Sequence, residues 1–319
     1  MADRATTRLR NSINAEKLLI MPGGFSPLAA RLCESLGYES FFLAGSQTNA
    51  HIYGQPDIGL IGLQEMAAAA RNIAAVSSIP VLADSDTGFG NAVSVFHAVE
   101  TYVRAGAAGL HIEDQEFPKL SGTAAGRRCI STEEAVGKYK AAVAARDAID
   151  PDFVVCARCD FIGAEGGDFE GAIERCLRYQ EAGADLIWLN NVQHREQVHE
   201  AAERIPGPVM PTFGGAPPGP TLEELQEWGA AVAIFPAMTS SVGLQAVWEL
   251  MNDFKERGLA AMDERRQQAA ASKWGAANFH NFVYPGSALV RDIEDNYLPS
   301  DVQRDYDNTF GNYGRPRRD

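Results

Sequence analysis

Short apolar segments alternate with Ala- and Glu-rich segments along this chain, and the alternation restricts the possible folds more than any other feature. Eight apolar runs rich in strand-forming residues occupy 18–23, 40–45, 79–84, 108–114, 153–160, 185–190, 208–213 and 231–236. The segments between them have helical spacing, for example over 62–77, 92–105, 132–147 and 169–182. Such alternation is typical of parallel sheets whose strands are joined by crossover helices.

Four segments share one local plan, which supports a repeated strand–helix unit. In SLGYESFFL, RAGAAGLHI, EAGADLIWL and EWGAAVAIF a helix ends, a glycine follows, and a strand begins two or three residues later. Eight expected strands favour an α/β fold, a closed (β/α)8 TIM-type barrel, over an open doubly wound sheet, although two wrongly assigned strands would restore the open sheet. We expect the barrel over residues 1–258 and a C-terminal helical extension with a charged tail over 259–319.

Charge and composition exclude several kinds of partner. The 319-residue chain carries a formal net charge of −14, which argues against nucleic acid and anionic membranes. Its N-terminus is polar, and no apolar run approaches the roughly 20 residues that span a bilayer, so we expect a cytoplasmic protein. Five scattered cysteines do not indicate a disulfide framework. Cys156 and Cys159 form a C-x-x-C, but on a strand they point to opposite faces, which argues against a zinc or redox site.

Acidic side chains gather where the expected strands end. Asp84 and Asp86 are two apart and share a face, and Glu113 ends the next strand. Three carboxylates at one barrel mouth would repel one another unless a cation neutralised them, and Mg²⁺ prefers carboxylate and water oxygens. We therefore predict a Mg²⁺ (or Mn²⁺) site at these three residues. Alternatively, the aspartates are loop acids or caps for a helix near Asn91. His111 shares the face of Glu113, as a partner of the site or as a core histidine.

Three stretches resemble one known family of enzymes. ADSDTGFGNAVSVFHAVETYVRAGAAGLHIEDQEFPK (83–119), QPDIG (55–59) and VVCARCD (154–160) are similar to the isocitrate lyase / phosphoenolpyruvate mutase superfamily. The resemblance extends from about Ile13 to Arg257. It implies a (β/α)8 barrel, a bound Mg²⁺, and a 2-oxo or 2-hydroxy acid substrate whose enolate the enzyme stabilises.

The resemblance assigns roles by position. Asp84 resembles the direct metal ligand, and Asp86 and Glu113 resemble ligands that act through water. Asp57 resembles an acid close to the metal-bound waters, and Lys119 resembles the lysine of a mobile lid.

Substrate contacts are implied in the same way. Arg158 resembles the residue that holds the substrate carboxylate, which suits its bidentate fork. Gly45 and Ser46 resemble a turn whose backbone donors hold the other end of the substrate. The full set of expected substrate-binding residues is Phe42, Gly45, Ser46, Arg158, Asn190, Trp188 and Thr212.

The chain departs from the lyases of this family at the lid and at one wall. Ser121 and Thr123 stand where those lyases carry the Cys proton donor and a His, and a serine hydroxyl is a far weaker acid than a thiol. Asn190 replaces a Glu, with Trp188 beside it. Thr212 resembles the branch of the family that processes phosphonates. Ser121 is nevertheless kept among the catalytic candidates with Asp57, Lys119 and Arg158.

These features leave three functions open. The core predicts a Mg²⁺-dependent lyase or decarboxylase that breaks a C–C bond of a 2-oxo or 2-hydroxy (di)carboxylic acid. A phosphonopyruvate-type mutase or hydrolase acting on a P–C bond is the first alternative, and a non-catalytic member with a relic metal site is the second. The resemblance also implies a homotetramer whose subunits exchange C-terminal helices.

Overall fold

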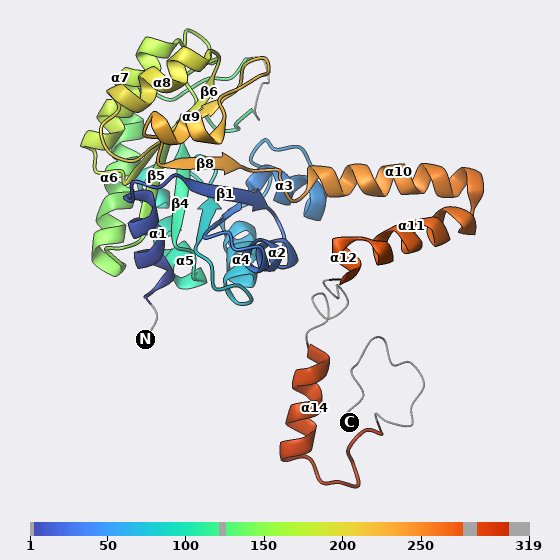
Figure 1. Cartoon of the computed structure of the whole chain (residues 1–319). Coiled ribbons are helices and arrows are strands. Elements are labelled where there is room, and N and C mark those ends of the chain that lie inside the picture. Colours follow the sequence, from blue (N-terminus) through green and yellow to red (C-terminus); the bar gives the residue numbers. More distant parts are fainter. Residues whose placement is uncertain (1–2, 121–125, 277–285, 306–319) are drawn as a thin grey trace. The chain divides into compact units, whose positions relative to one another are not determined.

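Two compact units make up the chain in the computed structural model, residues 1–243 and 244–319 (Figure 1). The structure describes residues 3–120, 126–276 and 286–305. The second unit starts inside α10 (Ser241–Arg257), ahead of the boundary expected at residue 258. That boundary between catalytic domain and extension stays a prediction.

Eight parallel strands form the sheet of the first unit. They are β1 Leu19–Gly24, β2 Phe41–Leu43, β3 Val81–Asp84, β4 Gly109–Glu113, β5 Val154–Cys159, β6 Leu186–Val192, β7 Val209–Phe213 and β8 Val232–Phe235. Neighbours follow the order β7-β6-β5-β4-β3-β2-β1-β8, and each paired register is parallel. The Ala231 amide also donates to the Val209 carbonyl (2.8 Å), which joins the beginnings of β8 and β7. The two edges therefore meet, so the predicted barrel is confirmed and the open sheet is excluded.

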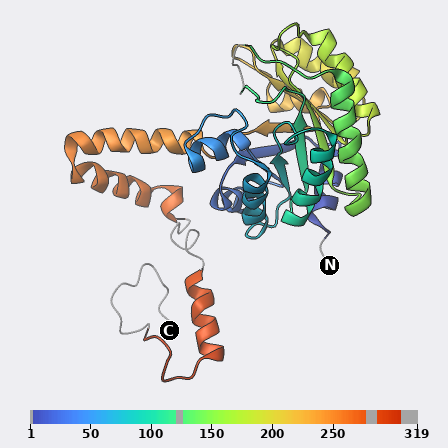
Figure 2. The same ribbon diagram turned by 180° about the vertical axis from the view of Figure 1, so that it is seen from behind.

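Helices alternate with the strands and cover them from outside (Figure 2). They are α2 Pro27–Ser35, α4 Leu63–Ala74, α5 Ala92–Ala105, α6 Thr132–Ile149, α7 Phe169–Glu181, α8 Arg195–Arg204 and α9 Leu222–Glu227. A short α3 (Gly45–Thr48) and a π-helix, η1 (Asn49–Tyr53), follow β2. The predicted glycine stops have φ between 82° and 97°, the left-handed region that ends a helix, at Gly37, Gly106, Gly183 and Gly229.

The barrel interior is packed and is closed at one end. Its buried cluster includes Met21, Phe42, Leu82, Cys156, Trp188 and Met210. Helix α1 (Ala5–Ile13) adds Leu9 and Ile13 to that cluster, and Arg10 donates to the carbonyl of Phe153 (3.1 Å) just before β5. The N-terminal ends of the strands are thus covered by α1, which leaves the C-terminal ends for chemistry.

A second buried cluster packs between the strands and the outer helices. Cys159 belongs to this outer cluster whereas Cys156 belongs to the interior one, so the two sulfurs face opposite sides as predicted. All five cysteines are free thiols.

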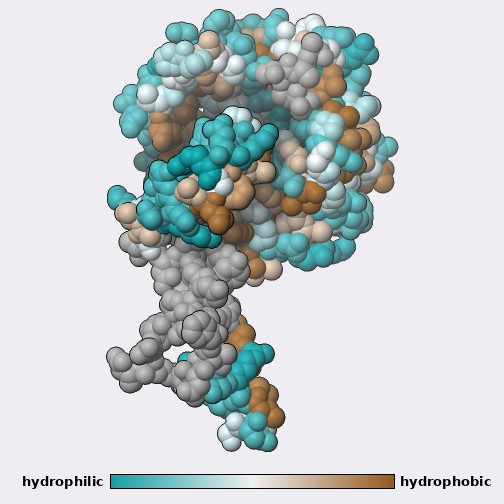
Figure 3. All heavy atoms as spheres, turned by 90° about the vertical axis from the view of Figure 1, so that its right-hand side faces the viewer, coloured by the Kyte–Doolittle hydropathy of each residue, from teal (hydrophilic) through white to brown (hydrophobic). Residues whose placement is uncertain are grey.

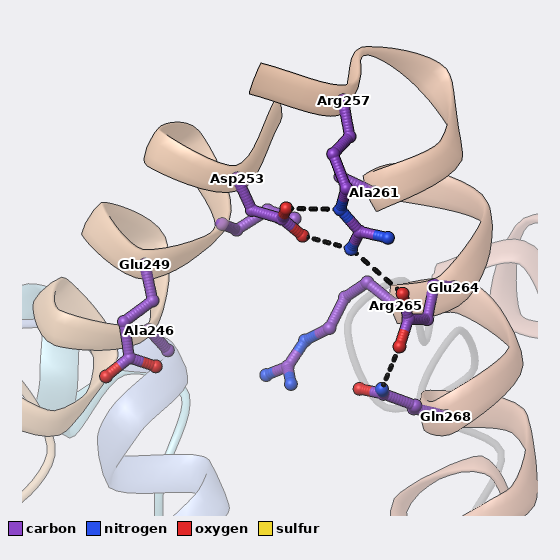
Figure 4. A pocket seen from close by; sticks show the side chains of 9 residues that line it. Ala246, Glu249, Asp253, Arg257, Ala261, Glu264, Arg265 and Gln268 are labelled. Atoms are coloured by element: carbon purple, nitrogen blue, oxygen red, sulfur yellow. Dashed lines mark hydrogen bonds and ion pairs between the residues drawn. The ribbon is translucent and has the colours of Figure 1, made fainter. Parts of the chain in front are cut away.

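The C-terminal unit consists of helices. After α10 come α11 (Leu259–Ala271), α12 (Lys273–Ala276) and α14 (Gly286–Tyr297). Arg257 pairs with Asp253 of α10 and with Glu264 of α11 (2.8 Å), and these side chains line a shallow pocket between the two helices (Figure 4). Along α14, apolar and hydrophilic atoms lie on different sides (Figure 3). No helix in the described ranges is long and apolar enough to cross a membrane.

Candidate active site

The turn after β3 aims two carboxylates at the mouth of the barrel. Asp84 is the last residue of β3, and Asp86 follows with a φ of 46°, an uncommon conformation for a residue other than glycine. Gly88 has a φ of 86°, and a Cβ there would lie 2.4 Å from Val95 Cγ2. The D-x-D-x-G pattern is therefore explained by a tight turn in which a strained Asp86 is held in place, a feature common at functional sites.

Asp84 is held by donors from three elements. Its Oδ2 accepts from the amide of Gly45 (2.8 Å), its Oδ1 accepts from the amide of Asp86 (2.9 Å), and His111 Nε2 lies 3.1 Å from Oδ1. A Cβ on Gly45 would lie 2.7 Å from Oδ2, so only glycine permits this approach. The substrate-binding role expected for Gly45 stays a prediction, and the structure adds that its amide donates to Asp84.

Electrostatics favour the charged form of Asp84. Burial alone raises the pKa of this carboxyl, but His111 and the Lys119 ammonium outweigh burial and hold the pKa well below its ordinary value. His111, open between two roles in the sequence, is a buried partner of the site.

Lys119 lies at the centre of three further carboxylates. Its Nζ is 3.0 Å from Asp57 Oδ1 and 3.4 Å from Glu113 Oε1, and it also contacts Asp86 Oδ1. Asp86, Glu113 and Lys119 are each at most 3% exposed. The sequence placed these four residues around one site, and the structure brings them together.

Burial shifts the pKa values of this cluster. Burial raises the pKa of Glu113 to about 8, against the opposing charges of Lys119 and Arg158. The same cause, aided by the charges of Asp84 and Asp57, raises the pKa of Asp86 to about 6. Burial lowers the pKa of Lys119, but the surrounding carboxylates outweigh it and raise that pKa well above its ordinary value. Burial and the mutual repulsion of the acids therefore raise the pKa values of Asp86 and Glu113, and the Lys119 ammonium opposes that rise.

Arg158 borders the same cluster and is held on both sides. Its Nη1 lies 3.1 Å from Glu113 Oε2, and its Nε and Nη2 lie 2.9 and 3.1 Å from the two oxygens of Asp160. The guanidinium carbon stands 4.6 Å from the centroid of the Trp188 ring. Its side chain is 13% exposed, so this rigid cation is presented at the mouth, where it can bind an anion.

A chain of hydrogen bonds joins β6 and β7 at one wall. Trp188 Nε1 donates to Thr212 Oγ1 (3.0 Å), Thr212 Oγ1 donates to Asn190 Oδ1 (2.9 Å), and Asn190 Nδ2 donates to Asp160 Oδ1 (2.6 Å). Trp188 is 3% exposed. It serves as a buried floor beneath Arg158, and the side chains of Asn190 and Thr212 are only partly buried.

An aromatic layer lies below the carboxylates. The rings of Phe42 and His111 stack with centroids 5.6 Å apart, and Trp188 meets both edge-on at 5.7 and 5.0 Å. Phe42 is 2% exposed. The substrate-binding roles of Phe42 and Trp188 stay predictions, and their place in the structure is the packed support of the site.

Two residues important to the site were not predicted from the sequence. Asp160 is fully buried and, besides Arg158 and Asn190, accepts from Arg127 Nη1 (3.0 Å) and from Gln115 Nε2 (3.3 Å). Arg127 is itself 2% exposed. The Asp160 position, two after Arg158 on one strand, was a usable signal, whereas nothing in GRRC marks Arg127 as buried.

The remaining residues concern the expected lid and the turn after β2. Ser121 and Thr123 of the expected lid lie outside the described residues. Ser46 is half-buried beside Gln47, whose amide donates to the Ser46 hydroxyl (3.4 Å). Cys129 points away from the cluster, with Sγ 3.5 Å from Asp114 Oδ1, and burial together with Asp114 raises its pKa strongly. Cys129 is therefore no substitute for the absent lid cysteine.

Comparison with known proteins assigns the chain to a family. The family model described as phosphoenolpyruvate phosphomutase matches residues 9–255. The chain belongs to this family. The 2,3-dimethylmalate lyase of Eubacterium barkeri is 34% identical over 292 residues, which cover 91% of this chain and 97% of the relative.

Two solved structures of related enzymes agree with this membership. Oxaloacetate acetylhydrolase in complex with the inhibitor 3,3-difluorooxalacetate matches with a TM-score of 0.80 and 29% identity, over 92% of this chain and 96% of that one. The complex of phosphonopyruvate hydrolase with oxalate and Mg²⁺ matches with a TM-score of 0.77 and 30% identity, over 93% and 100%. The predicted superfamily is confirmed, and the relative named 2,3-dimethylmalate lyase agrees with the predicted class of enzyme.

Proposed function

We propose that this chain is a Mg²⁺-dependent lyase that breaks a C–C bond of a 2-oxo or 2-hydroxy (di)carboxylic acid through an enolate. One observation carries the proposal. The buried Lys119 ammonium at the mouth of the barrel contacts three carboxylates, those of Asp57, Asp86 and Glu113. The partly exposed Arg158 lies directly beside this cluster and contacts Glu113. An acidic cluster next to a fixed guanidinium suits a substrate with a carboxylate and an oxygen that becomes negatively charged.

The residues present fit a hard divalent cation. Buried oxygens of Asp57, Asp86 and Glu113 accept no hydrogen bond and contact the Lys119 ammonium as ion pairs. Carboxylate oxygens are the ligands that Mg²⁺ prefers. No three Asp, Glu, His or Cys side chains in the described ranges form a ready-made direct metal site. We keep Asp84 as the proposed direct ligand, with Asp86 and Glu113 acting through water. When bound, the metal supplies a Lewis acid for developing oxyanion charge.

The chain's own side chains bind and orient the substrate. Arg158 offers its outward N–H groups to a substrate carboxylate, while Glu113 and Asp160 keep its plane fixed. Trp188 excludes water from beneath the guanidinium, which strengthens the ion pair. The leaving part of the substrate would then face Asn190 and Thr212, where a neutral amide and a hydroxyl favour a less charged group than the Glu-bearing lyases accept.

We assign the return of a proton to the enolate to solvent. In the metal-free site the Lys119 ammonium is held protonated among the carboxylates, and its raised pKa makes it a weaker acid than an ordinary lysine. Decarboxylation needs only a proton source such as solvent, because one proton replaces the carboxylate that leaves as CO₂, whereas an aldol-type cleavage also needs a base that takes the proton of the substrate hydroxyl.

The main test is a substrate panel for the full-length protein with Mg²⁺. Oxaloacetate, 2-methylmalate-type and isocitrate-type acids are supplied, and pyruvate or another 2-oxo acid product is measured. R158Q should abolish turnover, and R128Q, on an exposed arginine outside the site, serves as the matched control. No product from any of these acids, in protein that binds Mg²⁺ and oxalate by calorimetry, would contradict the proposed reaction.

Cleavage of a P–C bond is the second candidate. It is favoured by Thr212, which takes part in the wall through Trp188 and Asn190, and by the family member named phosphonopyruvate hydrolase. Phosphorus NMR of phosphonopyruvate incubated with the Mg²⁺-loaded protein decides between the candidates: a new resonance supports P–C chemistry, and an unchanged spectrum removes it. Protein that binds neither Mg²⁺ nor oxalate supports the non-catalytic alternative.

We also propose that the chain forms a homo-oligomer, a tetramer, through its C-terminal helices. Four apolar side chains of α10 at helical spacing, Leu244, Val247, Trp248 and Met251, are each more than half exposed. On a chain with net charge −14, a continuous apolar stripe is best covered by a second copy of the same helix.

The cytoplasmic location expected from the sequence stays a prediction.

A further inference from the structure

The Lys119 ammonium has the position and the partners of a bound cation. Its Nζ lies among carboxylates from three separate segments, namely Asp57 after η1, Asp86 after β3 and Glu113 at the end of β4. The lysine side chain is 3% exposed, and those of Asp86 and Glu113 are 4% and 1% exposed. A buried lysine surrounded by three acids is rare unless the charges compensate one another.

These contacts are ionic rather than directional. Asp57 Oδ1, Asp86 Oδ1 and both oxygens of Glu113 are buried without a hydrogen bond. Asp84 differs, because it accepts from the amides of Gly45 and Asp86. The cluster is thus a set of oxygens arranged around a charge, with no donor geometry that specifies an amine.

The other nearby cation does not replace Lys119. Arg158 touches Glu113, but two of its nitrogens face Asp160. If Lys119 leaves, Asp57 and Asp86 lose the cation that contacts them, and buried unpaired carboxylates are costly. A divalent cation supplies twice the charge of the ammonium and, together with its bound waters, occupies the space that these oxygens surround.

We propose that the Lys119 ammonium and the divalent metal are alternative occupants of one carboxylate cluster, so that metal binding expels Lys119 into solvent. This inference rests on the proposed metal site. Lys119 acts as a built-in counter-ion that keeps the acidic barrel mouth folded before the metal arrives, and its departure places a free ammonium at the rim where substrate enters. Affinity for the metal is lowered accordingly, because the metal must compete with it.

The chain contains a matched control lysine. Lys138 of α6 is buried to a similar degree, 4% exposed, and donates to the carbonyl of Thr87 (3.0 Å). It contacts none of Asp57, Asp86 and Glu113 in the ion pairs of the described residues. Its accessibility should therefore not respond to metal.

Amine labelling with mass spectrometry measures the exchange directly. The full-length, metal-stripped protein is treated briefly with an acetylating reagent across a MgCl₂ titration, with CaCl₂ and NaCl at matched ionic strength. Acetylation of Lys119 should rise about tenfold between metal-free and saturated protein, which corresponds to about 1.4 kcal/mol. The midpoint should match the Mg²⁺ dissociation constant from calorimetry, and acetylation of Lys138 should stay constant.

A substitution tests the same competition from the other side. K119M removes the competing charge, so Mg²⁺ should bind about tenfold more tightly than to the wild type, again about 1.4 kcal/mol. Mg²⁺ should also raise the melting temperature of K119M more than that of the wild type. K119R keeps a cation and should remain close to the wild type, as should K138M. If K119M does not fold without metal, the labelling experiment on the wild type decides alone.

The outcomes separate this inference from the proposed function. If Mg²⁺ binds by calorimetry while Lys119 stays as protected as Lys138, the exchange is wrong and the metal site stands. If neither Mg²⁺ nor Mn²⁺ binds, the metal site and the proposed lyase function are wrong, and the exchange with them. A rise in Lys119 labelling with NaCl as large as with MgCl₂ also contradicts the exchange, since it indicates simple screening.

Discussion

Replacing Asp160 with asparagine is the perturbation that tests most of the reasoning about this site. Asp160 is fully buried, and one carboxylate receives contacts from Arg158, Arg127, Asn190 and Gln115. Asparagine has nearly the same shape but carries no charge and turns one acceptor into a donor. D160N therefore leaves Arg127 buried with no other carboxylate partner in its ion pairs within the described ranges, and it frees Arg158 on one side.

The expected loss of stability follows from that uncompensated charge. Removing one partner of a buried ion pair costs about 3–5 kcal/mol. Arg158 keeps Glu113 at 3.1 Å, so the lower half of the range applies to it. Arg127 keeps a hydrogen bond to the Asp160 carbonyl at 3.4 Å, without a second carboxylate among the ion pairs of the described residues. For a unit of this size each kcal/mol lowers the melting temperature by roughly 2–4 °C, so D160N should melt roughly 6–20 °C below the wild type.

Thermal unfolding at pH 7, repeated at lower pH, measures this effect. D152N is the control, because Asp152 pairs with Arg4 at the surface with side chains 31% and 62% exposed, and such pairs contribute only about 0–1 kcal/mol. The pKa of Asp160 is depressed because Arg158 and Arg127 outweigh its burial. The stabilisation that ionised Asp160 adds to the free energy of unfolding is thus present above the pKa of an aspartate in the unfolded chain, about 3.9. It is lost as pH falls through the lower pKa of Asp160 in the folded protein. The difference in melting temperature between wild type and D160N should therefore decrease only under acid conditions.

Binding of oxalate distinguishes positioning from mere stability. In the presence of saturating Mg²⁺, D160N should bind oxalate about tenfold or more weakly, about 1.4 kcal/mol, while Mg²⁺ itself binds normally, because Asp160 contacts Arg158 and not the metal cluster. A D160N protein within about 1 kcal/mol of the wild type in stability, or with unchanged oxalate affinity, would refute the view that Asp160 fixes Arg158.

Three further predictions follow from single contacts. G88A should lower the free energy of unfolding by about 1–3 kcal/mol, measured in urea, because alanine resists the φ of 86° and its Cβ meets Val95; no change would contradict the turn geometry. W188F should cost about 1–3 kcal/mol, because it removes the hydrogen bond from Trp188 to Thr212, with W228F, outside the site, as control. W248D should reduce the oligomeric mass by light scattering, since it charges the exposed α10 stripe; an unchanged mass would exclude that stripe as the interface.

Much of the fold was accessible from local pattern. Apolar runs of strand length, helical spacing between them and glycine stops are short-range signals, and Gly37, Gly106, Gly183 and Gly229 all have the backbone conformation that their positions predicted. Closure of the barrel needed a correct count of eight, which the hydrogen bond from the Ala231 amide to the Val209 carbonyl, between the edges β8 and β7, confirms. The C-terminal unit gave no such signal, because its helices are not organised by alternation with strands.

The candidate site was predicted unevenly. Asp84, Asp86 and Glu113 were found because they end adjacent strands, and Lys119 and Arg158 through the family resemblance. The hydrogen bond from the Gly45 amide to Asp84 was not predicted. It is a 2.8 Å contact between residues 39 positions apart, which no local pattern encodes.

By itself the sequence determined the alternation of strands and helices, the acidic character of the barrel mouth and the family to which the chain belongs. These properties depend on residue type and spacing, so the sequence alone is enough to infer them. Only the tertiary structure decided which groups neutralise that acidity: Lys119 inside the carboxylate cluster, and Arg127 with Arg158 around Asp160. The physical reason is that charge compensation acts across a few ångströms of space, and residues such as Arg127 and Asp160, 33 positions apart, meet only after the barrel has closed.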